Sequence, residues 1–156
     1  MKLKRTHTCG ELAAKNTGHT VVLNGWVETR RDHGGLVFVD LRDRYGKTQI
    51  VFSTERNKEL HENVNQLKLE YVIAVKGKVE PRPEGTVNPK LATGEIEINA
   101  EELEILNEAR TTPFEISDST TPATELRLKY RYLDIRRPSV QKVLLQRSEI
   151  LKAIRD

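Results

Sequence analysis

A two-residue alternation over residues 36–52 constrains the fold of this chain more than any other feature. Successive side chains of a strand point to opposite faces, so the two valines and the second leucine of the segment 36–42 share one face. The opposite face carries Leu36, Phe38, Asp40 and Arg42. After a turn at 43–46, residues 48–52 continue the pattern with Ile50 and Phe52 inward and Gln49 and Val51 outward. The sequence therefore predicts a hairpin with one apolar face and one mixed face.

Three further strands are expected around this hairpin. They should cover residues 20–28, residues 71–79 and a segment within 95–106, and a helix is expected over 55–67. The segment 81–90 contains three prolines, which cannot sustain a strand ladder, and is therefore a loop. Three strands, a helix and two more strands are the order of an all-β fold, the five-stranded Greek-key β-barrel with one helix that is called the OB-fold.

The mixed face of the hairpin has the chemistry of a nucleic-acid reader. Phe38 stands among hydrogen-bonding side chains, next to a basic turn at Arg30-Arg31. Aromatic rings stack on unpaired bases, and polar neighbours read the edges of those bases. The loop between the fourth and fifth strands lies beside this face in OB-folds and takes part in oligonucleotide binding. The sequence thus predicts binding of single-stranded nucleic acid.

Charge distribution agrees with this prediction better than net charge does. The chain of 156 residues has a formal net charge of only +3. Its first 52 residues carry nine Lys/Arg and five Asp/Glu, whereas residues 53–110 carry eight and twelve. The single Cys9 allows no internal disulfide and no cysteine-based zinc site. No apolar run approaches the ~20 residues of a membrane span, so we expect a cytoplasmic protein with no membrane association.

The residue pattern of the chain changes after residue 106. We expect a barrel domain over 1–106, a hinge over 107–137 and the start of a further domain over 138–156. Pro138 suits the first turn of a helix, and the apolar residues that follow form a wide stripe to the end of the chain. Such a stripe needs a covering surface, so we expect a chain cut from a longer protein.

Three blocks of sequence resemble one family. The barrel block is Gly25-Trp26-Val27, Arg31-Asp32-His33-Gly34-Gly35-Leu36, Phe38, Asp40-Leu41-Arg42-Asp43, Gly46 and Gln49. The second block is Ala92-Thr93-Gly94-Glu95-Ile96-Glu97, and the third is Leu128-Lys129-Tyr130-Arg131-Tyr132-Leu133-Asp134-Ile135-Arg136-Arg137-Pro138. Together they resemble the N-terminal anticodon-binding domain of bacterial aspartyl-tRNA synthetases, and the third resembles the hinge before catalytic motif 1 of class II enzymes.

The resemblance implies a role for each candidate residue. Phe38 would stack on the middle anticodon base, and Gln49 would hydrogen-bond that uridine. Arg31 would contact the anticodon stem and loop, and Glu97 would read the first base. Arg82 and Asn88 would lie near the third base.

For the full-length protein, the resemblance implies a homodimeric aspartate-tRNA ligase that uses ATP and magnesium. The family's catalytic residues lie outside 1–156, so this fragment would contain no cofactor and no catalytic residue. Strict bacterial members tend to carry Leu and Lys where this chain has His33 and Gly85. These departures resemble the non-discriminating type, which charges tRNA(Asp) and tRNA(Asn) and relies on a separate amidotransferase.

Alternatives remain open from the residues alone. A free-standing OB protein that binds single strands without sequence preference would share the barrel and its mixed face. An outward Phe38 can be covered by a loop, and Gln49 can be an ordinary solvated strand residue. Binding of poly-pyrimidine strands as tightly as an aspartate-type anticodon loop would favour the free-standing protein.

Overall fold

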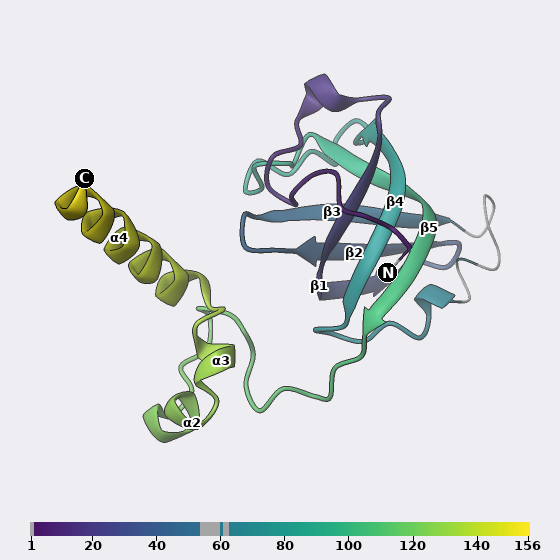
Figure 1. Cartoon of the computed structure of the whole chain (residues 1–156). Coiled ribbons are helices and arrows are strands. Elements are labelled where there is room, and N and C mark those ends of the chain that lie inside the picture. Colours follow the sequence, from purple (N-terminus) through teal and green to yellow (C-terminus); the bar gives the residue numbers. More distant parts are fainter. Residues whose placement is uncertain (1, 54–59, 61–62) are drawn as a thin grey trace. The chain divides into compact units, whose positions relative to one another are not determined.

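The computed structural model describes residues 2–53, 60 and 63–156, and within them five strands close into a barrel (Figure 1). The strands are β1 (Thr20–Asp32), β2 (Leu36–Arg42), β3 (Lys47–Ser53), β4 (Val72–Pro81) and β5 (Ile96–Asn107). They follow one another around the barrel as β1-β2-β3-β5-β4, and β4 pairs back with β1. β3 and β5 pair in parallel and the other neighbours pair antiparallel. The predicted OB-fold is confirmed.

The inner face of the barrel is the apolar face that alternation predicts. Its fully buried side chains are Val21, Leu23, Val27, Val37, Val39, Leu41, Ile50, Phe52, Ile73, Val75, Val79, Ile96 and Ile98. The helix expected over 55–67 falls largely on residues outside those described. Leu60, Val64 and Leu67 of that segment are buried in the barrel core. A short 3-10 helix, η1 (Ala14–Asn16), was not predicted.

β1 is longer than predicted and contains a bulge. Val27 pairs with Leu41 and Thr29 pairs with Asp40, so Glu28 is an extra residue on β1. The prediction of a basic turn at 30–31 is wrong, because both arginines lie inside β1 and the turn follows at 33–35. Beyond the bulge β1 continues to pair with β2, as far as Asp32 opposite Val37.

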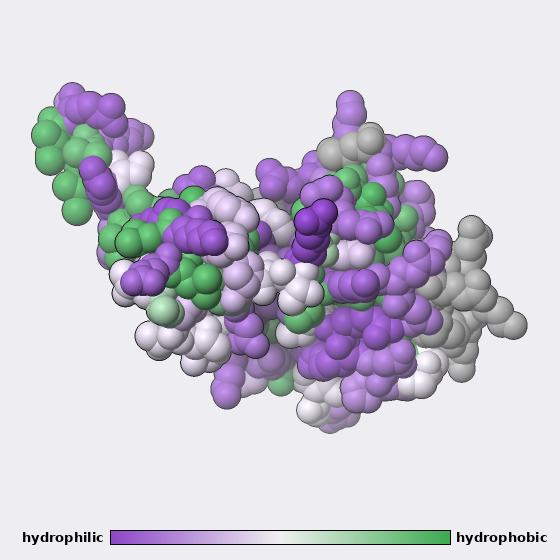
Figure 2. All heavy atoms as spheres, turned by 90° about the horizontal axis from the view of Figure 1, so that it is seen from below, coloured by the Kyte–Doolittle hydropathy of each residue, from purple (hydrophilic) through white to green (hydrophobic). Residues whose placement is uncertain are grey.

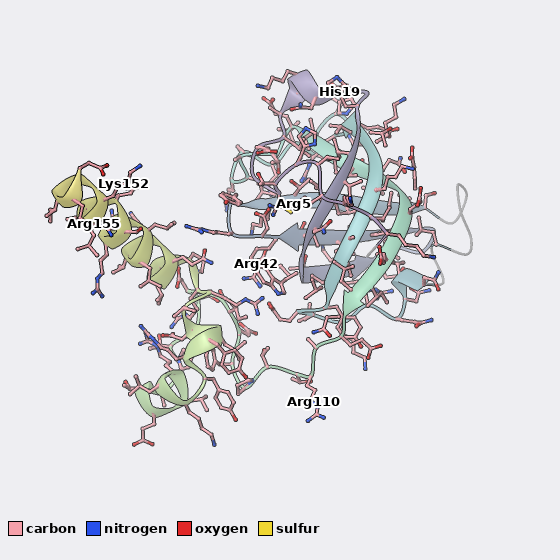
Figure 3. All side chains as sticks on the ribbon, in the orientation of Figure 1. Arg5, His19, Arg42, Arg110, Lys152 and Arg155 are labelled. Carbon is pink, nitrogen blue, oxygen red and sulfur yellow. The ribbon has the colours of Figure 1, made fainter. Side chains whose placement is uncertain are left out.

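The contacts divide the chain into two compact units, residues 1–111 and 112–156. Arg110 projects from the extended segment that leaves β5 (Figure 3). The second unit contains α2 (Thr124–Lys129), α3 (Arg131–Asp134) and α4 (Pro138–Arg155). The helix that begins at Pro138 was predicted from the sequence.

The second unit is organised around one buried carboxylate. The side chain of Asp134 is fully buried and pairs with Arg127, Arg131 and Arg137. The hydrogen bond from Arg127, at 2.8 Å, and the neighbouring positive charges hold the pKa of Asp134 below its usual range. Three arginines thus neutralise a charge that would be costly to bury alone.

α4 exposes both apolar and charged side chains (Figure 2). Its exposed large apolar residues are Val143, Leu144, Leu145, Ile150, Leu151 and Ile154. The apolar stripe expected from the sequence therefore lies at the surface of this unit. Among the described residues, no helix combines the length and the apolar character needed to cross a lipid bilayer.

Candidate nucleic-acid interface

A hollow of about 420 Å³ lies on the outer surface of the barrel, where β1, β2 and β3 meet the loop after β4. Six of the eight predicted site residues line it: Arg31, His33, Phe38, Gln49, Arg82 and Asn88. Thr86, Val87 and Pro89 of the loop complete the lining, and no signal in the sequence singled them out. Residues far apart in the sequence therefore share one concave surface.

Phe38 supplies an aromatic surface in this hollow. It lies on the outer face of β2 between Arg31 of β1 and Val51 of β3, and it is half-buried. The His33 ring stands edge-on to it, with 5.6 Å between ring centroids and an interplanar angle of 78°. This T-shaped contact leaves His33 and Phe38 as two neighbouring rings on one wall, an arrangement suited to stacking on a base.

Gln49 lies on the predicted face of β3 but is more buried than expected, with 8% of its surface exposed. Its Nε2 donates to Oε2 of Glu97 at 2.9 Å, and its Oε1 accepts from Nη2 of Arg31 at 3.4 Å. Val51, also predicted to point outward, is 5% exposed. The outward positions of β3 are therefore buried, and the polar atoms of Gln49 are paired with Glu97 and Arg31.

Arg31 is held in place by Asp40, which the sequence did not single out as a site residue. Nη2 of Arg31 donates to both carboxylate oxygens of Asp40, at 3.1 and 3.2 Å. The Thr29 hydroxyl donates to Oδ2 of the same carboxylate. Thr29, Asp40 and Gln49 are direct neighbours across β1, β2 and β3. Only the strand register reveals this row, because the three residues are separated in the sequence.

Glu97 of β5 completes the network behind Gln49 by accepting from its Nε2, although Glu97 itself does not line the hollow. Burial raises the pKa of Glu97, while the hydrogen bond from Gln49 and the charge of Arg82 act in the opposite direction. Glu80 of β4, which pairs directly with Glu97, adds a second negative charge and raises the pKa further. The structure thus holds a carboxylate where its ionised form is disfavoured, in contact with the amide of Gln49.

The loop between β4 and β5 is held in shape by its own hydrogen bonds. Nε of Arg82 donates to the Ile96 carbonyl at 3.1 Å, and its Nη1 donates to the Thr86 carbonyl at 3.4 Å. The backbone N–H of Asn88 donates to the backbone carbonyl of Gly94 at 3.0 Å. A Cβ at Gly94 would stand 1.8 Å from the Asn88 oxygen, so only glycine allows this approach.

Gly85 and Glu97 are the two predicted site residues that do not line the hollow. Gly85 lies at the exposed tip of the same loop, with φ of +79° and open space where a side chain would stand. Glu97 reaches the site through its bond to Gln49. Among the residues that the structure describes, no group of three His, Cys, Asp or Glu side chains could hold a metal ion.

Comparison with known proteins agrees with this geometry. The family model for tRNA anticodon binding, described as an OB-fold nucleic acid binding domain, matches residues 21–106. The Aspartate--tRNA(Asp/Asn) ligase of Caldanaerobacter subterraneus subsp. tengcongensis is 54% identical over 99% of this chain, and that of a Geobacillus species is 55% identical over 97%. The chain spans 26% of the length of each of these two relatives.

Among solved structures, asparaginyl-tRNA synthetase from Pyrococcus horikoshii superposes with a TM-score of 0.81 at 26% sequence identity. The match covers 98% of this chain and 34% of that one. The family model covers more than half of the chain, and its matched residues contain the residues that line the hollow and all of the barrel strands except the first residue of β1 and the last of β5. The chain therefore belongs to the tRNA anticodon-binding family of OB-fold nucleic-acid-binding domains.

Proposed function

We propose that this chain is the anticodon-reading domain of an aspartate-tRNA ligase that charges both tRNA(Asp) and tRNA(Asn). The observation that carries the proposal is the hollow, which gathers an aromatic ring, an amide and two arginines on the OB-fold face that binds oligonucleotides. The names of the relatives, which are 54% and 55% identical to it, support the choice of amino acid and of the two tRNAs.

In this proposal each residue of the hollow has a distinct task. Phe38, beside the His33 ring, stacks on the middle base of the anticodon. Gln49 reads the edge of that uridine, and Arg31 contacts the backbone of the loop through its charge. Glu97 reads the first base. Arg82 and Asn88 approach the third base.

We assign the remaining functions to the full-length protein. Residues 1–106 form the anticodon-binding domain, 107–137 the hinge and 138–156 the start of the catalytic domain. Aspartate activation with ATP and magnesium then belongs to sequence outside this chain, which is not expected to catalyse any reaction alone. The full-length protein acts in the cytoplasm as a homodimer, and an amidotransferase converts the aspartate on tRNA(Asn).

Binding of anticodon stem-loops to the 156-residue chain tests the anticodon-reading role. The aspartate-type loop, a loop with cytidine in the middle position and a poly-pyrimidine strand are titrated at one salt concentration, because such affinities depend strongly on salt. We expect the aspartate-type loop to bind most tightly. Equal binding of all three would instead identify a single-strand binder without sequence preference.

His33 and Gly85 provide the test of relaxed specificity. The aspartate and asparagine anticodons differ in the third base, C against U. His33 can donate to or accept from either pyrimidine. Gly85 has open space where a lysine would extend a cation, at a φ of +79° that disfavours any side chain. The double variant His33→Leu with Gly85→Lys should therefore favour tRNA(Asp), through weaker charging of tRNA(Asn) by the full-length enzyme. A wild-type enzyme that already rejects tRNA(Asn) would refute the relaxed type.

A further inference from the structure

The amide of Gln49 can read either pyrimidine, depending on which way it is turned. A uracil edge offers a carbonyl acceptor beside an N–H donor, and the NH₂ and C=O of an amide match these two groups. Cytosine offers an amino donor beside a nitrogen acceptor, and the same amide rotated by 180° matches them. Selection of uridine therefore requires the amide to be fixed in one orientation.

The structure contains groups that fix it on both sides. Nη2 of Arg31 contacts Oε1 of Gln49, and a guanidinium can only donate. Oε2 of Glu97 accepts from Nε2 of Gln49, and this hydrogen bond favours the ionised carboxylate, which can only accept. Rotation of the Gln49 amide by 180° would place its NH₂ beside the Arg31 guanidinium, so two donors would meet. It would also place its oxygen beside the Glu97 carboxylate, so two acceptors would meet. Both contacts leave one amide hydrogen and one lone pair of Gln49 for the base.

The Arg31 side of this arrangement depends in turn on Asp40. The Arg31 side chain is 49% exposed, so its position is not determined by packing alone. The Asp40 side chain is 16% exposed and accepts two bonds from the same Nη2 that reaches Gln49. Thr29, two residues before Arg31 on β1, donates to Oδ2 of Asp40 and limits the rotation of the carboxylate. The carboxylate is therefore well placed to anchor the guanidinium against Gln49.

We propose that Asp40, supported by Thr29, is a positioning residue for pyrimidine selection: it holds Arg31 against Gln49 and so fixes the amide in the uridine-reading orientation. The inference rests on the proposed anticodon-reading function. Asp40 is not among the residues that line the hollow, and it acts through Arg31 and Gln49, to which the proposed function assigns contacts with the RNA.

The experiment measures the ratio of affinities for the uridine and cytidine loops in Asp40→Asn and Asp40→Ala. Each variant should lower this ratio about 3- to 10-fold, the factor associated with one net hydrogen bond. The slope of affinity against salt should stay unchanged, because Arg31 keeps its charge. Thr29→Val should act in the same direction with a smaller factor. The matched control is Glu102→Gln, which breaks an ion pair with Lys76 on β4 and β5, outside the residues that line the hollow, and should leave the ratio unchanged.

A second set of measurements separates positioning from a general structural effect. In a Gln49→Ala background, Asp40→Asn should have no further effect on the ratio, because the residue it positions is gone. Equal weakening on both loops, or an unchanged ratio in folded Asp40→Ala and Asp40→Asn, would overturn the inference about Asp40. A wild-type chain that binds both loops equally would overturn the proposed function itself.

Discussion

Replacement of Phe38 by alanine tests the stacking surface most directly. Phe38 lies on the outer face of β2, whereas its neighbours Val37 and Val39 are fully buried on the inner face. Base–aromatic stacking contributes about 1–3 kcal/mol. Since each 1.4 kcal/mol is a factor of ten, we expect Phe38→Ala to weaken anticodon-loop binding by about 5- to 140-fold.

The same substitution should have a small effect on folding. The ring is half-buried and its recorded aromatic contact is the edge-on one with His33. The free energy of unfolding should therefore fall by less than the ~3–5 kcal/mol typical of Phe→Ala in a core. Phe52→Ala is the core comparison, because Phe52 is fully buried on β3. Phe52→Ala should lower the free energy of unfolding by the full ~3–5 kcal/mol.

The assay is a titration of fluorescent anticodon stem-loop into each variant, with urea unfolding of the same preparations. Tyr45→Ala is the matched control, since Tyr45 is an exposed ring in the turn at the other end of the same hairpin. It should bind like the wild type. A folded Phe38→Ala chain with wild-type affinity would refute the stacking role, and a chain that unfolds would show that Phe38 belongs to the core.

Three further predictions concern the polar network. Gln49→Ala should lose about 1–2 kcal/mol on the uridine loop and less on the cytidine loop, whereas equal losses would exclude base reading. Arg31→Ala should reduce the salt slope of binding by about one ion and should also lower the uridine preference, because Arg31 contacts Gln49. Burial raises the pKa of Glu97, so its ionised form destabilises the fold above that pKa. Glu97→Gln should therefore have a higher melting temperature than the wild type at pH 7. The difference should shrink as the pH falls through the folded-state pKa and the native Glu97 becomes neutral. A less stable variant at pH 7 would contradict this reasoning.

Alternation predicted the parts of the fold in which polar and apolar residues differ clearly. In β2 and β5 every buried apolar residue is followed by a polar or half-buried one, so the strand period and the inner face are both readable. β3 was read correctly for Ile50 and Phe52, but both of its outward neighbours, Gln49 and Val51, are buried as well. Alternation reports which face a residue occupies. It does not report what covers that face.

The grouping of the site residues depends on contacts that no local pattern encodes. Asn88 enters the hollow through a loop whose close approach to Gly94 is made possible by the missing side chain of that glycine. Asp40 joins the site because the register aligns it with Thr29 on one side and Gln49 on the other. Its position next to Phe38 on the same face was readable from the sequence, but its partners were not.

The bulge at Glu28 explains why Arg31 was placed in a turn rather than on the binding face. Val21, Leu23 and Val27 point inward, so an uninterrupted strand would turn Arg31 inward too. The extra residue reverses the phase, and Arg31 then pairs with Phe38 on the outer face. Two adjacent arginines offer no contrast in polarity, so the sequence cannot show which of them faces outward. Arg30 takes the opposite direction and donates to the Val64 carbonyl at 3.3 Å. One inserted residue thus brings Thr29 and Arg31 together onto the face that carries Phe38, Asp40 and Gln49.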